Sequence, residues 1–287
     1  MSSPVPVTPL PFVPTPARRP ARALLAPLNP GVEGWAGRRV WVVGASSGIG
    51  AELALALRRR GARVAVSARR ADALHALLDD PEAAGAPEAE VLPLDATDAR
   101  AVADACERLR ARWGGVDLVL WVAGLYVPMR ARGFDLAIAR RMLDTNVGAV
   151  LGGLAAVLPT LLEQRSGGIA LVSSVAGYGG LPQALVYGPT KAALINLAES
   201  LYLDLHPEGI GVYVINPGFV ETPATAVNGF EMPALISARR AAEATLAGIE
   251  AGRFDIHFPR RFTLWLKLAR LLPYRLYFAA VRRVTGG

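Results

Sequence analysis

Residues 40–60 read VWVVGASSGIGAELALALRRR, and this stretch decides the fold. Its first four residues favour a buried strand, whereas the residues from Ala51 onward are strong helix formers. Gly44, Gly48 and Gly50 stand between them in a GxxxGxG spacing. Such a turn lets the backbone approach a phosphate, which the free N–H groups at the helix N-terminus can hold. The stretch therefore predicts a nucleotide-binding turn. The alternative is a corner that uses glycine only for its geometry.

The region after this stretch repeats the alternation of strand and helix. With residues 39–43 as the first strand, further strands are predicted at 63–67, 90–94, 117–122, 169–173, 211–215 and 254–258. The long helices are predicted at 51–60, 99–113, 134–164 and 187–206. Strict alternation of this kind is typical of a parallel sheet with right-handed crossovers. We therefore predict one Rossmann-type, doubly wound α/β domain of about seven strands with helices on both faces.

Composition excludes several classes of protein. Of 287 residues, 52% are hydrophobic and 19% are charged, which excludes an intrinsically disordered chain. A single cysteine, Cys106, excludes an intramolecular disulfide and a cysteine-based zinc cluster. The three histidines show no ligand spacing, so no metal site is expected. Prolines interrupt every apolar run near the N-terminus, which argues against a secretory signal, and we expect a cytoplasmic protein.

The net charge of +7 belongs to the two ends of the chain. Residues 260–287 carry +7 without an acid, residues 1–39 carry +4, and residues 40–259 carry −4. A nucleic-acid partner is not expected, because its binding surface would place positive charge on the folded domain. Nine prolines fall in the first thirty residues. We therefore predict a flexible, Pro-rich arm over residues 1–36, the Rossmann-fold domain over 37–259 and a basic, apolar tail over 260–287.

Tyr187 and Lys191 are candidates for acid–base chemistry. They stand four residues apart in a predicted helix, so their side chains rise on one face. A phenol, with a pKa of about 10, needs a neighbouring cation to exchange protons at neutral pH. The chain has only two lysines among its 31 basic residues, so lysine is not its default cation. Ser174 follows the strand at 169–173, at the sheet edge where open α/β folds bind ligands. The alternatives are an exposed helix face and a strand-end serine.

The glycine turn at 44–50, then Ser174, then Tyr187 and Lys191, in this order, resemble the short-chain dehydrogenase/reductase family over about residues 38–259. Asn216-Pro217-Gly218 and Thr222 complete the set. The resemblance implies an oxidoreductase that uses NAD(P) to interconvert a small-molecule alcohol and carbonyl. It also implies catalytic roles for Ser174, Tyr187, Lys191 and Asn146, where Asn146 orders a water; the alternative for Asn146 is a residue that breaks a long helix. Family habit further implies a homodimer or homotetramer.

The resemblance also implies a set of cofactor-binding residues. They are Gly44, Ser46, Ser47, Gly48, Ile49, Gly50, Arg69, Arg70, Asp95, Ala123, Gly124, Tyr187, Lys191, Pro217, Gly218, Val220 and Thr222. Ala68 stands where NAD-preferring relatives place an acid, and two arginines follow it, which favours NADP(H) over NAD(H). Asp95 matches the position that holds the adenine; the alternative is an aspartate that forms a turn.

One departure from the family pattern keeps a second function open. The usual Asn-Asn-Ala-Gly run reads Trp121-Val122-Ala123-Gly124, so the amides that steady the central sheet are lost. An enzyme is expected, with reduction of a ketone or aldehyde as its reaction. The alternative is a nucleotide-binding scaffold or redox sensor with little turnover.

The tail reads RFTLWLKLARLLPYRLYFAAV over residues 261–281. A helical wheel gathers Thr263, Lys267 and Arg270 in a narrow sector and leaves a wide apolar face. Several cations and Pro273 argue against a spanning helix. Two hypotheses stay open: contact with a membrane surface, or packing on the domain as a lid or subunit contact. Membrane contact would favour an apolar, lipid-like substrate, in a site lined by Val175, Tyr178, Leu181, Pro182 and residues 219–235.

Overall fold

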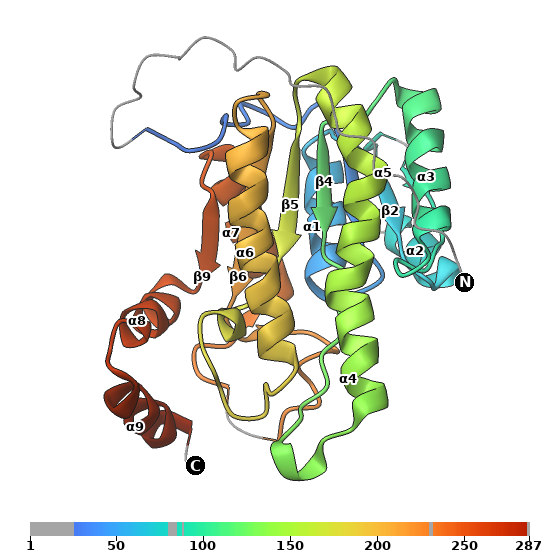
Figure 1. Ribbon diagram of the computed structural model, residues 1–287. Coiled ribbons are helices and arrows are strands. Elements are labelled where there is room, and N and C mark those ends of the chain that lie inside the picture. The colour runs from blue at the N-terminus through green and yellow to red at the C-terminus, as the bar shows by residue number, and fades with distance from the viewer. Residues whose placement is uncertain (1–25, 80–84, 88, 230–231, 286–287) are drawn as a thin grey trace, which may run out of the picture.

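The computed structural model describes residues 26–79, 85–87, 89–229 and 232–285. Among these residues, seven parallel strands form one sheet in the order β3-β2-β1-β4-β5-β6-β9 (Figure 1). They are β1 (Arg39–Val43), β2 (Arg63–Ser67), β3 (Glu90–Val91), β4 (Leu118–Trp121), β5 (Gly168–Val172), β6 (Gly211–Pro217) and β9 (Asp255–Phe258). The strand order reverses between β1 and β4, which is where such sheets bind ligands. The predicted fold class is confirmed.

Helices cover both faces of the sheet. They are α1 (Gly48–Arg59), α2 (Ala71–Leu78), α3 (Ala99–Trp113), α4 (Leu136–Leu143), α5 (Ala149–Gln164), α6 (Tyr187–Leu205), α7 (Ala238–Glu250), α8 (Arg260–Arg270) and α9 (Tyr274–Thr285). The side chains of β1 alternate between two cores: Trp41 and Val43 pack with α3 and α5, whereas Val40 and Val42 pack with α1 and α7. Two short strands, β7 (Val220–Glu221) and β8 (Ile236–Ser237), pair beside the main sheet.

Two elements differ from the prediction. The strand predicted at 90–94 ends at Val91, although the N–H groups of Leu92 and Leu94 still donate to the carbonyls of Val66 and Ala68 over 3.0 Å. The helix predicted at 134–164 is divided by a π-helical turn, Asp144–Gly148, between α4 and α5. By length and composition the run Leu136–Gln164 could cross a membrane, and 44% of its apolar window is buried inside the domain.

Residues before the predicted domain boundary pack on the domain. The side chain of Asn29 donates to the carbonyl of Val212 over 2.7 Å and accepts from the N–H of Val212 over 2.9 Å. These bonds satisfy the backbone of β6 before its pairing with β9 begins at Val214. The buried indole of Trp35 donates to Glu250 over 2.6 Å. The arm predicted to be flexible as far as residue 36 is therefore anchored at these positions. Residues 1–25 lie outside the described residues.

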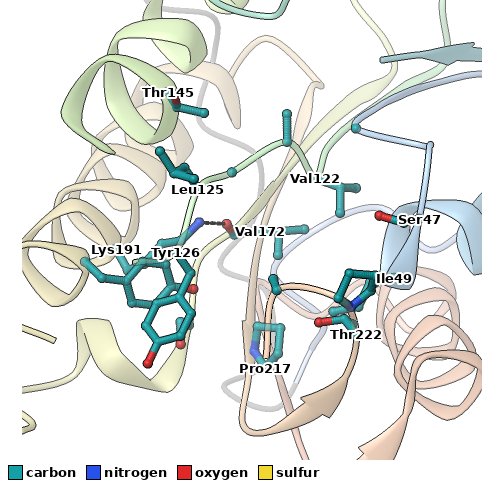
Figure 2. A pocket seen from close by; sticks show the side chains of 18 of the residues that line it. Ser47, Ile49, Val122, Leu125, Tyr126, Thr145, Val172, Lys191, Pro217 and Thr222 are labelled. Atoms are coloured by element: carbon teal, nitrogen blue, oxygen red, sulfur yellow. Dashed lines mark hydrogen bonds between the residues drawn. The ribbon is translucent and has the colours of Figure 1, made fainter. Parts of the chain in front are cut away.

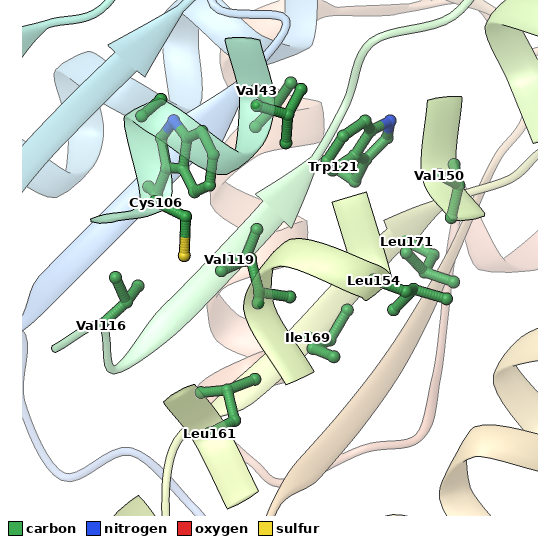
Figure 3. Packing of buried hydrophobic residues seen from close by; sticks show 14 of the residues in the cluster. Val43, Cys106, Val116, Val119, Trp121, Val150, Leu154, Leu161, Ile169 and Leu171 are labelled. Atoms are coloured by element: carbon green, nitrogen blue, oxygen red, sulfur yellow. The ribbon is translucent and has the colours of Figure 1, made fainter. Parts of the chain in front are cut away.

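Trp121, at the end of β4, fills the core between the sheet and α5 (Figure 3). A Cβ on Gly153 would lie 2.0 Å from the indole Cζ3 atom, so only glycine leaves room for this ring. The indole N–H is buried and has no hydrogen-bond partner among the described residues. Packing thus takes the place of the amide hydrogen bonds that the family pattern would supply here.

We predict that Gly153→Ala lowers the free energy of unfolding by about 1–3 kcal/mol, because the added methyl group overpacks the contact with Trp121. In an unconstrained helix the same change would be stabilising by about 1 kcal/mol. Urea denaturation measures the difference. In a Trp121→Ala background the substitution should be neutral or stabilising, and an equal loss in both backgrounds would contradict the account.

Candidate active site

A cavity of about 1130 Å³ opens at the carboxyl edge of the sheet, where the strand order reverses (Figure 2). Most of the candidate residues from the sequence line it: Gly44, Ser46, Ser47, Gly48, Ile49, Arg69, Arg70, Asp95, Ala123, Gly124, Ser174, Tyr187, Lys191, Pro217, Gly218, Val220 and Thr222. Gly50 and Asn146 are not among the lining residues. The fold therefore brings segments far apart in the sequence to one site.

The glycine turn is pressed against neighbouring backbone. Gly44 has a φ of 98°, and a Cβ there would lie 2.4 Å from the nitrogen of Ala123. A Cβ on Gly50 would lie 2.1 Å from the carbonyl oxygen of Gly44. At the start of α1, Ser47 makes no side-chain cap hydrogen bond and the first turn holds no acid. The N-terminus of α1 can therefore receive an anion.

The end of β2 presents cations to the cavity. Ala68, Arg69 and Arg70 line it, and the guanidinium of Arg70 donates to the carbonyl of Ser46 over 3.3 Å. Asp95 accepts from the backbone N–H and the hydroxyl of Thr97 over 2.9 and 2.8 Å. These bonds, and then the charge of Arg69, hold the pKa of Asp95 below its usual value. Asp95 therefore forms a turn and also lines the cavity.

Lys191 lies buried below Tyr187. Its ammonium donates to the carbonyl of Val172 over 2.9 Å and lies 5.6 Å from the centroid of the Tyr187 ring (Figure 2 shows the bond to Val172). Burial lowers the pKa of Lys191 to about 8. Burial also raises the pKa of Tyr187 to about 12, and a hydrogen bond with the hydroxyl of Ser174 partly offsets this. The three side chains thus meet in one place.

Asn146 lies behind the cavity wall in the π-helical turn. Its amide accepts from the N–H of Leu125 over 2.6 Å and donates to the carbonyl of Leu125 over 2.9 Å and to Thr190 over 3.0 Å. It thereby ties the loop after β4 to α6, next to Lys191. A Cβ on Gly124 would lie 3.4 Å from both the Asn146 oxygen and the Lys191 nitrogen. The side chain of Asn146 makes three hydrogen bonds, which give it a positioning contact in this structure.

Sequence reasoning missed Tyr126 in the cavity wall. The ring of Tyr126 meets that of Tyr187 edge-on, with centroids 4.8 Å apart. Its hydroxyl donates to Asn228 over 2.9 Å, and burial raises its pKa, so it remains a neutral donor. Tyr126 follows Ala123-Gly124 at a strand end, and that position could have flagged it. Asn228 belongs to the expected lining segment 219–235, but nothing in the sequence predicts its bond to Tyr126, which only the tertiary fold brings close.

The expected substrate residues are mostly in place. Val175, Leu181, Pro182 and Phe219 line the cavity. Tyr178 does not: its ring lies 5.3 Å below the ammonium of Lys267 in α8, and its hydroxyl is buried without a partner among the described residues. The expectation that Tyr178 lines the cavity is wrong, because the chain turns it toward the C-terminal helices.

Comparisons with known proteins agree with this geometry. A family model described as short chain dehydrogenase matches residues 38–231. An uncharacterized oxidoreductase of Myxococcus xanthus is 40% identical over 247 residues, which are 86% of this chain and 97% of that protein. The structure of a short chain dehydrogenase from Burkholderia cenocepacia in complex with NADP is 25% identical with a TM-score of 0.75, and covers 86% of this chain and 98% of its own. A structure named ribose-5-phosphate isomerase, from Brucella melitensis, is 26% identical with a TM-score of 0.68. The match covers 77% of this chain and 91% of that protein.

Proposed function

Because this chain belongs to the short-chain dehydrogenase/reductase family and is an oxidoreductase of that family, we propose that it interconverts an alcohol and a carbonyl with NADP(H), and that it reduces a ketone or aldehyde on an apolar molecule. The observation that carries the proposal is the meeting of Ser174, Tyr187 and Lys191 at the cavity. The family and the structural neighbour support the coarser statement, which is an oxidoreductase that binds NAD(P).

The side chains divide the proton chemistry between them. When bound, the nicotinamide supplies or accepts a hydride. In reduction, Tyr187 donates its proton to the carbonyl oxygen, and the Ser174 hydroxyl hydrogen-bonds to the same oxygen. Lys191 places a positive charge beside the phenol and thereby favours the phenolate that this donation leaves. In oxidation Tyr187 takes the proton back as a base.

The residues present fit the cofactor. The glycine turn leaves no space for side chains, and the N-terminus of α1 would hold the pyrophosphate. Lys191 would also hold the ribose, and Pro217, Gly218, Val220 and Thr222 would border the nicotinamide. Arg69 and Arg70 would meet a 2′-phosphate, since Ala68 supplies no carboxylate at the end of β2. The relative solved with NADP supports this preference.

The wall of the cavity supports an apolar substrate. Val175, Leu181, Pro182 and Phe219 present hydrocarbon to it, and Tyr126 and Asn228 add a polar pair opposite. The proposed compartment is the cytoplasm, since the lone cysteine, Cys106, is buried as a free thiol.

A homodimer or homotetramer is also part of the proposal. Helices α4 and α5 expose large apolar side chains on the surface of the protein. These are Leu136, Leu143, Leu151 and Leu162, each between 42% and 53% exposed. A second subunit that covers them would remove this surface from water.

We predict that Tyr187→Phe lowers kcat for carbonyl reduction by about 10²–10⁴-fold, because it removes the proton donor. Cofactor binding, measured by calorimetry, should persist. Oxidation of NADPH with a panel of apolar ketones and aldehydes measures the rate, and Tyr202→Phe in the same helix is the matched control. Unchanged turnover in Tyr187→Phe would favour the scaffold or sensor, and conversion of substrate without net loss of NADPH would favour an isomerase.

We predict that Arg69→Ala together with Arg70→Ala lowers kcat/KM for NADPH by about 10–100-fold, the worth of a charge-assisted contact with the 2′-phosphate. The value for NADH should change little. Arg240→Ala, which changes an exposed arginine of α7, is the control. Equal losses with both cofactors would show that the two arginines do not read the 2′-phosphate.

A further inference from the structure

Most of the large apolar side chains of the C-terminal helices are exposed. Trp265 is 62% exposed, Leu268 64% and Leu271 80%. We call the surface formed by Leu264, Trp265, Leu268, Leu271, Leu276 and Phe278 the outer face. All six residues fall within 15 positions of one another on α8, α9 and the turn between them. A cluster of this kind on a folded protein marks a contact with a membrane or with another protein.

The side of α8 that faces the domain includes its polar side chains. Thr263 is fully buried, and its hydroxyl lies 2.6 Å from Nδ1 of His257. Lys267 forms an ion pair with Asp255 at the edge of the sheet. An amphipathic helix that only completed its own domain would bury its apolar side and expose its cations. In α8 most of the apolar surface is exposed instead, while Thr263 and Lys267 contact the domain, so polar contacts hold the outer face outward.

The charge around the outer face selects the kind of partner. Six arginines of α8 and α9 are exposed: Arg260, Arg261, Arg270, Arg275, Arg282 and Arg283. Residues 260–287 contain no acid. A second copy of this chain, docked about a two-fold axis, would bring the same cations against each other. An anionic phospholipid surface would instead accept both the apolar side chains and the arginines.

The inner side of these helices contacts two loops that border the substrate cavity. One lies between β5 and α6 and holds Gly180, and the other follows β6 and holds Phe219. The hydroxyl of Tyr277 donates to the carbonyl of Gly180 over 2.9 Å, next to Leu181. The rings of Phe262 and Phe219 lie 5.8 Å apart between centroids. Figure 1 shows α8 and α9 beyond the carboxyl end of β9, beside these loops. A surface bound to the outer face would therefore lie close to the entrance of the cavity.

We infer that the outer face docks the protein on an anionic phospholipid membrane, with α8 and α9 lying in the plane of the headgroups. The docking follows from the placement of apolar and cationic side chains and does not depend on the reaction. Its consequence, that an apolar substrate enters the cavity directly from the bilayer, rests on the proposed function.

Flotation of the full chain with vesicles tests the inference. The protein should float with vesicles of phosphatidylcholine and phosphatidylglycerol, and much less with phosphatidylcholine alone or at high salt. Trp265→Ser with Leu268→Ser should lower the partition coefficient by about 100-fold, about tenfold for each apolar side chain withdrawn from the interface. Leu203→Ser, which changes a 72% exposed leucine of α6, is the matched control and should float like the native chain.

Two results would overturn the inference. One is flotation that the double substitution leaves unchanged. The other is native protein that stays with the soluble fraction. If the double substitution then also alters its sedimentation, the outer face belongs to a contact with a second copy. Binding to vesicles is measured without substrate or cofactor, so it can succeed where the proposed reaction fails. If the protein binds vesicles and also catalyses the proposed reaction, vesicles should lower KM for an apolar ketone in the native chain. They should leave this KM unchanged in the double variant.

Discussion

A buried ammonium at the carboxyl edge of the sheet is the constraint on which the site depends. Lys191 is only 4% exposed, and the carbonyl of Val172 at the end of β5 is its hydrogen-bond partner. Burial of a charge is costly unless it is hydrogen-bonded, and the lowered pKa of Lys191 reflects that cost. Gly124 lies next to the ammonium, and Asn146 holds the loop that carries Gly124. The fold thus holds a buried, hydrogen-bonded ammonium beside the phenol of Tyr187.

The altered strand end at Trp121 shows how the central sheet tolerates the loss of polar contacts. The indole takes the space that Gly153 leaves in α5, so packing with one helix stabilises β4. The next residues keep the geometry that the cavity needs: the N–H of Ala123 bonds to Val43, and Gly124 faces Lys191. The departure therefore changes the core at Trp121 and the cavity wall at Val122, whereas Ala123 and Gly124 keep the family pattern.

The sequence was enough to predict the sheet because local periodicity determines it. β1, β2 and α3 have the predicted limits, since hydrophobic alternation and a good cap at Asp98 act within a few residues. The π-helical turn was not predicted, because tertiary hydrogen bonds of Asn146 accompany it. The pair of Tyr126 and Asn228 spans 102 residues and has no local signal. The helical wheel separated the two sides of α8, but only the position of Asp255 decides which side faces inward.

The pKa of Lys191 tests the central claim most directly, and the composition makes it measurable. The chain contains two lysines, so NMR of protein labelled with ¹³C at the lysine side chain gives two lysine signals, and Lys191→Met identifies that of Lys191. Since burial disfavours the ammonium, the Lys191 signal of the cofactor-free protein should titrate with a midpoint pKa of about 8. A midpoint at the ordinary value of 10.5 would show that Lys191 lies in water, away from Tyr187, and would contradict the account.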